Sequence, residues 1–397
     1  MTECWEKKSL RDIDVCGKKV IVRVDFNVPL DENKQVTDDN RLRRSLPTIE
    51  CLQKQGAKII LMSHLGRPKG VVDLKYSLAP VVERLSQMLN QKVLFAEDCV
   101  GSEAARLASS LQGGQILLLE NLRFYTEEQN NDPVFAKKLA DLADIYVDDA
   151  FGTAHREHAS IVGITKYLPA VCGLLLEKEL TKLGATLKSP ARPFVSIIGG
   201  AKVADKIDVI ESLLQKVDKI LIGGGMAYTF FAAQGYDMQK CLVDESKLAW
   251  AKELLSRPEA KAKIVLPIDT VVAAEISADA PEKVVSMDAI PAGWMGLDIG
   301  PETIKLFRKE IDKAQTIIWN GPCGVFEIPQ FARGTMAIAK MLAESSAYTI
   351  VGGGDSVAAV RAAKVVDVID HVSTGGGASL KLLQGKRLPG VVALDDK

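Results

Sequence analysis

Short apolar runs rich in valine and isoleucine alternate with helical patterns along both halves of the chain. In the first half the pattern predicts strands at 20–25, 58–63, 93–96, 116–120 and 145–149 and helices at 42–55, 78–89, 102–110 and 133–143. In the second half it predicts strands at 194–199, 219–223, 264–266, 316–320 and 348–351. Strands that are apolar almost throughout and are separated by helices form parallel sheets covered by helices on both faces. The expected fold class is therefore α/β, with two doubly wound parallel-sheet (Rossmann-like) domains.

The segment at 174–187 separates the two arrays. Its leucines and charged residues recur at helical spacing, and Ser189, Pro190 and Pro193 end the pattern. A chain of 397 residues has room for two or three domains of roughly 150 residues each. We therefore expect a first domain at 1–173, a helical hinge at 174–187 and a second domain that begins at 188.

The charges of the chain almost balance, since 50 Lys and Arg stand against 51 Asp and Glu. No global basic field draws in nucleic acid, so anion binding must be local. Seven single cysteines without a CxxC pair suit a reducing compartment. The N-terminal residues lack an apolar signal region, and the uncharged stretch 220–236 is shorter than the ~20 apolar residues of a membrane span. We expect a soluble, cytoplasmic protein that binds neither nucleic acid nor membrane.

Polar side chains follow several strands of the first half, where the carboxyl ends of parallel strands meet at one edge of a sheet. These residues are Asp25, Asn27, His64, Arg67, Arg123, His155 and Arg156, and Arg41 opens the first helix. Any one arginine at such a position is more often a surface ion-pair partner than a ligand. Their recurrence, however, favours a pocket for a small anion with more than one negative group, which arginine grips bidentately.

Glycine-rich turns distinguish the second half. The segment 197–206 predicts a strand, a glycine turn and then a helix that carries Lys202 and Lys206 one turn apart on one face, suited to neutralising a transferring phosphoryl group. The alternative is an ordinary turn with solvated lysines. At 352–356, Gly353 and Gly354 offer backbone N–H groups to phosphates and Asp355 offers a carboxylate to Mg²⁺, unless Asp355 is only a helix cap. Further glycine triplets lie at 223–225 and 375–377.

Several familiar nucleotide and hydrolase motifs are missing from the sequence. It contains no G-x-G-x-x-G, no G-x-x-x-x-G-K-[ST], no HExxH and no GxSxG, nor a Cys/His set with metal-ligand spacing. A nucleotide site in this chain is therefore neither of the dinucleotide-fingerprint type nor of the P-loop type.

Seven motifs in order along the chain resemble those of the phosphoglycerate kinase family. They are RVDFNVP at 23–29, SHLGRP at 63–68, ENLRF at 120–124, FGTAHR at 151–156, GGAKVADK at 199–206, GGGDS at 352–356 and STGGGAS at 373–379. The resemblance spans nearly the whole chain. It implies reversible phosphoryl transfer from 1,3-bisphosphoglycerate to MgADP, giving 3-phosphoglycerate and MgATP, as in glycolysis.

The resemblance also implies roles for single residues. Those that would bind the glycerate substrate are Asp25, Phe26, Asn27, Arg41, His64, Leu65, Gly66, Arg67, Arg123 and Arg156. Those that would bind the nucleotide are Lys202, Lys206, Gly223, Gly224, Gly296, Glu327, Gly353, Gly354, Asp355 and Ser356, with Glu327 on the ribose and Asp355 on Mg²⁺. The catalytic set would be Arg41, Lys202 and Gly376.

The resemblance further implies which substrate binds to which domain. The glycerate would bind to the domain at 1–173 and the nucleotide to the domain at 188–378, with 379–397 returning to the first domain. Since the sites lie in different domains, we expect hinge bending, with direct in-line transfer after closure, in a monomer. Two alternatives stay open: a binding or regulatory protein that keeps the fold without catalysis, and a kinase that acts on another small carboxylate.

Overall fold

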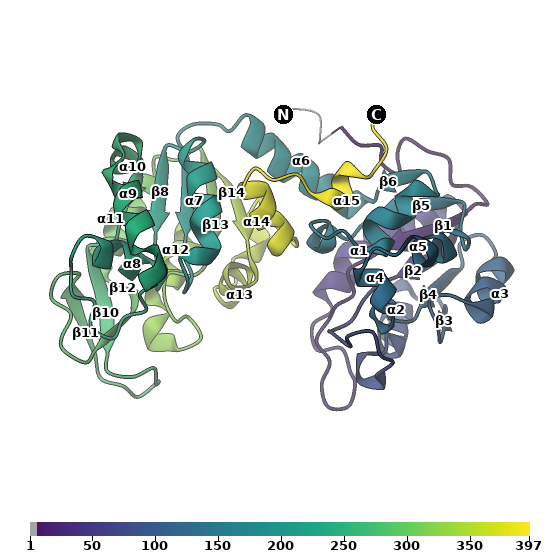
Figure 1. Cartoon of the computed structure of the whole chain (residues 1–397), viewed down its shortest axis with the longest axis horizontal. Coiled ribbons are helices and arrows are strands. Elements are labelled where there is room, and N and C mark those ends of the chain that lie inside the picture. Colours follow the sequence, from purple (N-terminus) through teal and green to yellow (C-terminus); the bar gives the residue numbers. More distant parts are fainter. Residues whose placement is uncertain (1–5) are drawn as a thin grey trace. The chain divides into compact units, whose positions relative to one another are not determined.

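The computed structural model describes residues 6–397, and their contacts divide them into two units (Figure 1). The first unit extends to Gly184 and also includes Arg387–Lys397, whereas the second is Ala185–Lys386. The returning segment therefore begins at Arg387 and not at residue 379. The reason is that α14 (Gly377–Leu383) packs on α7 (Ile207–Leu214) within the second unit.

A six-stranded parallel sheet forms the centre of the first unit, in the order β3-β4-β2-β1-β5-β6. Its strands are β1 (Lys19–Arg23), β2 (Lys58–Met62), β3 (Val93–Ala96), β4 (Ile116–Leu119), β5 (Ile145–Asp148) and β6 (Ala170–Cys172). All the strands that the sequence predicted in this half are present, most of them ending one or two residues early because the chain turns away at polar residues. β6 was not predicted, since its three residues are too few for a recognisable pattern.

Helices cover both faces of this first sheet. They are α1 (Asn40–Lys54), α2 (Ala79–Leu89), α3 (Ser102–Ser110), α4 (Thr126–Gln129), α5 (Pro133–Ala140), the first part of α6 (Leu174–Lys188) and α15 (Pro389–Val392). Right-handed crossovers place α1 and α2 on one face, and α3 and α5 on the other. In agreement, Leu42 and Leu52 of α1 and Leu85 of α2 join one buried core with alternate residues of β1, β2 and β4.

The second unit repeats this plan, with a parallel sheet in the order β15-β14-β13-β7-β8-β9. The strands are β7 (Phe194–Ile198), β8 (Lys219–Ile222), β9 (Ile264–Val265), β13 (Thr316–Asn320), β14 (Tyr348–Gly352) and β15 (His371–Val372). Besides α7 and α14 its helices are α8 (Met226–Ala233), α9 (Leu248–Ser256), α10 (Pro258–Lys263), α11 (Pro301–Ile311), α12 (Arg333–Glu344) and α13 (Gly354–Ala362). Two doubly wound parallel sheets confirm the expected fold class.

A small antiparallel sheet in the second unit was not predicted. It consists of β10 (Asp269–Ala273), β11 (Glu282–Ser286) and β12 (Met295–Ile299), in the order β11-β10-β12. β11 is exposed and charged at one end, and β12 contains a glycine and an aspartate. Such strands lack the apolar continuity that marks the strands of the large sheets.

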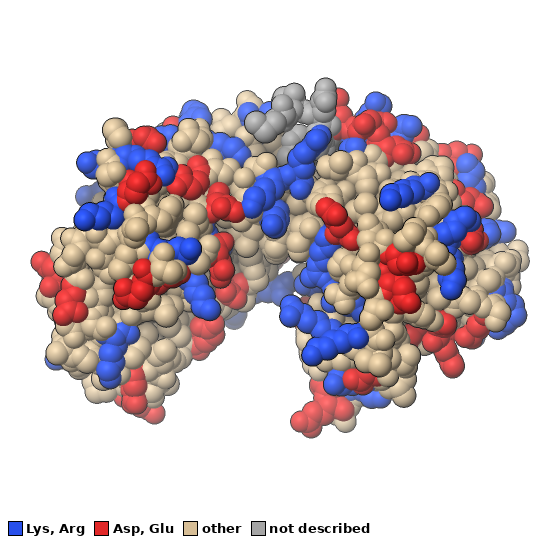
Figure 2. Space-filling model, viewed as in Figure 1, with Lys and Arg blue, Asp and Glu red and all other residues tan. Residues whose placement is uncertain are grey.

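The surface matches the balanced composition. Figure 2 shows Lys and Arg interspersed with Asp and Glu over the face that it draws. No helix among residues 6–397 is long and apolar enough to cross a membrane.

Candidate active site

In the first unit, the loops that follow β1 and β2 are tied together at the carboxyl edge of the sheet. The Phe26 amide donates to Ser63 Oγ (2.9 Å), and Ser63 Oγ donates to the carbonyl of Val24 (2.8 Å). Asn27 Oδ1 accepts from the Gly66 amide at 2.8 Å. The structure therefore brings the predicted residues after β1 beside those after β2.

The loop after β2 is also held from β4. Asn121 Nδ2 donates to the Leu65 carbonyl (2.8 Å), and Arg123 Nη1 donates to the Gly66 carbonyl (2.6 Å). Gly66 has a positive φ of 60°, and a Cβ there would lie 2.3 Å from the ring of Tyr76, so only glycine fits. Arg123 is thus buried and bonded to the backbone of the loop after β2. The backbone of this loop is held in place at Leu65 and Gly66.

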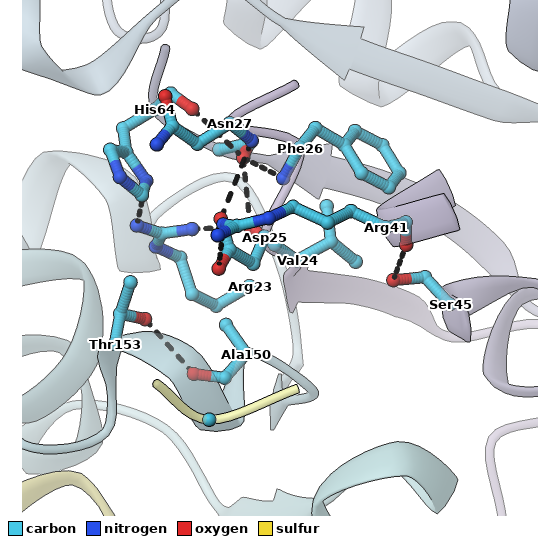
Figure 3. Close-up of polar contacts among 12 residues, drawn as sticks. Arg23, Val24, Asp25, Phe26, Asn27, Arg41, Ser45, His64, Ala150 and Thr153 are labelled. Carbon is cyan, nitrogen blue, oxygen red and sulfur yellow. Dashed lines mark hydrogen bonds and ion pairs between the residues drawn. The ribbon is translucent and has the colours of Figure 1, made fainter. Parts of the chain in front are cut away.

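Arg41 and Asp25 form an ion pair at this edge (Figure 3). Arg41 lies in the first turn of α1 and its side chain is 41% exposed, while Asp25 is more buried. Figure 3 shows Arg23 and His64 converging on the same place. Burial lowers the pKa of Arg156, and so do the positive charges of Arg23, Arg67 and Arg41. The carboxylate of Asp25 raises it. Arg41, Arg67 and Arg156 thus bring three further guanidinium groups around the single carboxylate of Asp25, which leaves a surplus of positive charge for an anion.

His64 is buried and neutral. Burial lowers its pKa well below the usual value, and the charges of Arg23, Arg156 and Arg41 lower it further. His155 and Arg156 follow the short 3₁₀ turn Phe151–Thr153 after β5. Arg67 is exposed on the loop after β2.

The second unit contains a cavity of about 600 Å³ at the carboxyl edge of its sheet. It lies beside the ends of β7 and β13, the adjacent strands from which the chain proceeds in opposite directions, where open α/β sheets bind ligands. Gly200 and Pro322 come from these two strand ends. Leu242, Met295, Leu297 and Val325 provide apolar lining, and the acidic lining residues are Glu327 and Asp355. Apolar walls with a few polar groups suit a flat base with attached hydroxyls and phosphates.

Three predicted glycines are required by packing around this cavity. A Cβ at Gly296 would lie 1.9 Å from the Tyr228 hydroxyl, and one at Gly224, whose φ is 69°, would lie 2.7 Å from the Gly200 amide nitrogen. Both residues line the cavity. Gly223 does not line the cavity. It lies against Cys323, which does, and a Cβ at Gly223 would be 2.6 Å from Cys323 Sγ. Its place is therefore behind the wall that Cys323 forms.

Lys206 and the segment 352–356 meet at the end of β13. Lys206 Nζ donates to Asn320 Oδ1, and Asn320 Nδ2 donates to the Gly352 carbonyl at 2.9 Å. The Gly321 amide donates to Ser356 Oγ at 2.6 Å. Burial lowers the pKa of Lys206 to about 8, opposed by the charges of Asp205 and Asp355. The ammonium is thus poorly solvated and suited to a phosphate partner.

One local prediction about this region is wrong. Lys202 and Lys206 do not share a helical face, because Lys202 lies in irregular backbone before the 3₁₀ turn Ala204–Lys206, which Lys206 ends. Helix α7 begins only at Ile207. Lys202 is exposed while Lys206 reaches Asn320, so the two ammonium groups have different surroundings.

Two glycine turns precede helices as the sequence predicted. Gly353, with φ 91°, is the N-cap of α13, so Gly354, Asp355 and Ser356 form its first turn. Asp355 is therefore not the N-cap, which removes the simplest alternative to a metal role. Gly376, with φ 45°, precedes α14, and nothing lies within 4 Å of the position of its Cβ.

The donor set fits a magnesium ion that arrives with a nucleotide. Among residues 6–397, no group of three or more His, Cys, Asp and Glu side chains could hold a metal ion. Asp355 is exposed in the first turn of α13 beside the glycine-rich backbone. Mg²⁺ bound through phosphates and water needs only one or two protein carboxylates.

Sequence reasoning missed Arg23, Ser63 and Asn320. The signal for Arg23 was a charged residue that ends an otherwise apolar strand, KVIVR, in which it is 1% exposed. The signal for Asn320 was the amide that ends TIIWN. Ser63 carried no signal of its own.

Comparison with known proteins agrees with this geometry. The family model described as phosphoglycerate kinase matches residues 10–386. The chain is 56% identical over 393 residues to the cytosolic phosphoglycerate kinase of Triticum aestivum, covering 98% of each chain. It is also 56% identical over 396 residues to the phosphoglycerate kinase of Chlorobaculum tepidum, covering 98% of this chain and 100% of the relative. The solved structure of the Coxiella burnetii phosphoglycerate kinase superposes with a TM-score of 0.88 at 41% identity, covering 98% of each chain. The chain therefore belongs to the phosphoglycerate kinase family.

Proposed function

We propose that the arginine-rich edge of the first sheet binds 3-phosphoglycerate and 1,3-bisphosphoglycerate, and that the cavity of the second unit binds ADP and ATP. As a member of its family the chain is a phosphotransferase with a carboxyl group as acceptor. It moves a phosphoryl group reversibly from 1,3-bisphosphoglycerate to MgADP. The observation that supports the assignment most is the surplus of guanidinium groups around Asp25 and His64.

The glycerate site uses the residues held by the loops after β1, β2 and β4. Arg41, Arg67 and Arg156 provide charge for the phosphate and carboxylate, and His64 and Asn27 provide hydrogen bonds. Asp25 orients Arg41 through their ion pair until the substrate competes for it. Four other predicted residues fix the positions of these loops through hydrogen bonds that involve their own or a neighbouring backbone group: Phe26, Leu65, Gly66 and Arg123.

The nucleotide site uses the cavity and the glycine turns beside it. The base lies against the apolar wall near Gly224 and Gly296, with Gly223 supporting that wall from behind, and Glu327 accepts from the ribose hydroxyls. Gly353, Gly354, Ser356 and Lys206 hold the phosphates. Asp355 contributes the protein ligand of Mg²⁺, which neutralises phosphate charge when bound.

Direct in-line transfer needs no covalent enzyme intermediate and no general base, because the donor is already an acyl phosphate and the acceptor an ADP oxygen. Arg41, Lys202 and the backbone N–H groups at Gly376 stabilise the charge on the transferring group. Reacting atoms must approach to within ~3–3.5 Å. Since the two substrates are assigned to different units, we propose that the units close before transfer, with α6 and the returning segment as the hinge. Identical X-ray scattering profiles with and without both substrates would contradict closure.

The direct test is ATP formation from MgADP and 1,3-bisphosphoglycerate with Arg41→Ala beside the unmodified chain. Arg43→Ala is a matched control, because Arg43 lies on the same helix but is exposed and paired with Asp39. We expect a loss of roughly 10²–10³-fold in kcat for Arg41→Ala, as for loss of one transition-state donor, and near-normal turnover for Arg43→Ala. Full activity in Arg41→Ala would remove that residue from the mechanism.

The same assay checks this activity against the two alternatives that the sequence alone left open. A chain that binds MgADP but forms no ATP would be a binding protein that has kept the fold. Turnover with a different acyl phosphate and none with 1,3-bisphosphoglycerate would mean a kinase for another small carboxylate. We further propose a monomer in the cytoplasm with small-molecule partners only, which sedimentation and cell fractionation can check.

A further inference from the structure

A buried chain of hydrogen bonds reaches His64 from the short helix α4. Glu128 Oε1 accepts from Ser160 Oγ at 2.6 Å, and Glu128 Oε2 accepts from the Ser160 amide at 2.9 Å. Arg23 Nε donates to Ser160 Oγ at 3.0 Å, and Arg23 Nη2 lies 3.0 Å from His64 Nδ1. One carboxylate is thus connected to His64 through one hydroxyl and one guanidinium.

All four side chains are withdrawn from solvent. Glu128 and Ser160 are completely buried, Arg23 is 1% exposed and His64 is 2% exposed. Isolated charges at such depth are costly, so the carboxylate of Glu128 compensates the guanidinium of Arg23. Ser160 lies in the π-helical segment Ala159–Gly163, a form of backbone that is frequent at functional sites. Two further groups adjoin the chain: His158 Nδ1 lies 3.6 Å from Glu128 Oε1, and the Val24 carbonyl accepts from Arg23 Nη1. Neither of them joins Glu128 to Arg23, so this connection depends on Ser160.

The direction of these hydrogen bonds determines the tautomer of His64. A guanidinium has only donors, so the Nδ1 atom facing Arg23 must be the acceptor. His64 is neutral, so its single ring proton is on Nε2. The ring consequently presents an N–H donor, suited to a substrate oxygen, on its side away from Arg23 (Figure 3).

We propose that Glu128 is a positioning residue for substrate binding: through Ser160 it holds Arg23 against His64 and so keeps His64 in the Nε2–H tautomer. This rests on the proposed function in one respect, that His64 contacts the glycerate substrate. Glu128 itself touches no substrate in this scheme. A purely structural role for Glu128 would alter stability without altering the His64 ring.

The first test measures the ring and needs no substrate. In protein labelled with ¹⁵N-histidine, long-range ¹H–¹⁵N spectra distinguish a protonated from an unprotonated ring nitrogen. We expect the unmodified chain to show His64 with a proton on Nε2 only, and Glu128→Gln to show a mixture of tautomers. Glu127→Gln is the matched control, because Glu127 is the exposed neighbour on the same helix. A single unchanged Nε2–H tautomer in folded Glu128→Gln would overturn the proposal.

Ser160 offers an independent break in the chain. Ser160→Ala removes the hydroxyl that joins Glu128 to Arg23, and Ser160→Thr restores a hydroxyl at the same place. We expect the mixed tautomers in Ser160→Ala and recovery in Ser160→Thr. If Glu128→Gln does not fold, these two variants carry the test, and an unperturbed ring in Ser160→Ala would overturn the proposal.

The second test is kinetic, in the direction that consumes 3-phosphoglycerate. We expect Glu128→Gln to raise KM for 3-phosphoglycerate roughly three- to tenfold, the effect of one weakened hydrogen bond, with KM for MgATP unchanged. An equal change in both KM values would show a general structural defect and contradict the proposal. Titration of the unmodified chain with 3-phosphoglycerate tells the two ideas apart: no change at His64 would refute the substrate contact, whereas the tautomer result stands without it.

Discussion

Lys206 Nζ donates a hydrogen bond to Oδ1 of Asn320, the residue that ends β13. The same amide donates from Nδ2 to the carbonyl of Gly352, so one side chain connects the lysine to the glycine turn before α13. Burial lowers the pKa of Lys206 to about 8, and the charges of Asp205 and Asp355 oppose this shift. The charge that would meet nucleotide phosphates is therefore lost within an accessible range of pH.

We accordingly expect MgADP to bind less tightly as the pH rises through about 8. The ammonium form of Lys206 is present below that pKa, and a bound phosphate raises the pKa. About half a unit above the pKa of the free chain, near pH 8.5, nucleotide binding therefore takes up protons. Calorimetry in buffers of different ionisation enthalpy measures this uptake directly. Lys206→Arg, which stays charged, should abolish the uptake, and proton uptake that persists in this variant would assign the titration to another group.

Much of the fold followed from residue patterns because its strands are apolar on both faces. β3 and β13 were predicted to their exact ends, since polar or turn residues bound them on both sides. β11 and β12 were missed because a small sheet with an exposed strand has no such continuity. The helix predicted to include Lys202 and Lys206 begins only at Ile207, after a 3₁₀ turn. This was missed because AKVADK consists mostly of ordinary helix formers, and the contact of Lys206 with Asn320 at the end of β13 is visible only in the structure.

The site was less accessible to sequence reasoning than the fold. Gly296 lies on a strand with no recognised motif, and what requires glycine there is the hydroxyl of Tyr228, 68 residues away in the sequence by the residue numbers. Likewise, nothing local distinguishes Glu128 from Glu127, although one is buried and the other exposed. Roles that depend on a partner distant in the chain become visible only when the partner is placed.

Asp149 is expected to make stability depend on pH. Burial raises its pKa to about 8, opposed by hydrogen bonds from Thr48 and from the amides of Leu175 and Leu176 in α6. A raised pKa in the folded state means that the folded chain holds the proton more tightly, so the stability from this group is complete below about pH 4 and is lost as the pH rises to about 8.

Asp149→Asn removes that dependence. We expect the variant to gain free energy of unfolding relative to the unmodified chain between pH 4 and pH 8, by at most about 1.4 kcal/mol per pH unit. Urea unfolding at several pH values measures it, with exposed Glu50→Gln on α1 as control. A difference that does not vary with pH would mean that Asp149 ionises normally in the folded chain.

Lys7 is expected to stabilise the returning segment. Its buried Nζ donates to the carbonyls of Val392 (3.2 Å) and Leu394 (2.7 Å) and to the carboxylate of Asp396. Lys7→Met leaves the buried carbonyl groups without a donor, at a cost of about 1–3 kcal/mol. We expect faster proteolytic removal of the last residues in this variant, while Lys8→Met, whose side chain is only partly buried, behaves as the unmodified chain does. Equal cleavage rates in all three would contradict the role of Lys7.

Gly223 and Cys323 are expected to be energetically coupled, because a Cβ at Gly223 would lie 2.6 Å from Cys323 Sγ. Gly223→Ala should cost about 1–3 kcal/mol through overpacking and should weaken MgADP binding, since Cys323 lines the cavity. Cys323→Ala removes the sulfur and leaves the side-chain Cβ at 3.1 Å, a close contact that small shifts relieve. We therefore expect Gly223→Ala to cost less than half as much in the Cys323→Ala background, a coupling that a double-mutant cycle in urea measures. Strict additivity of the two substitutions would show that Gly223 is required by something other than this sulfur.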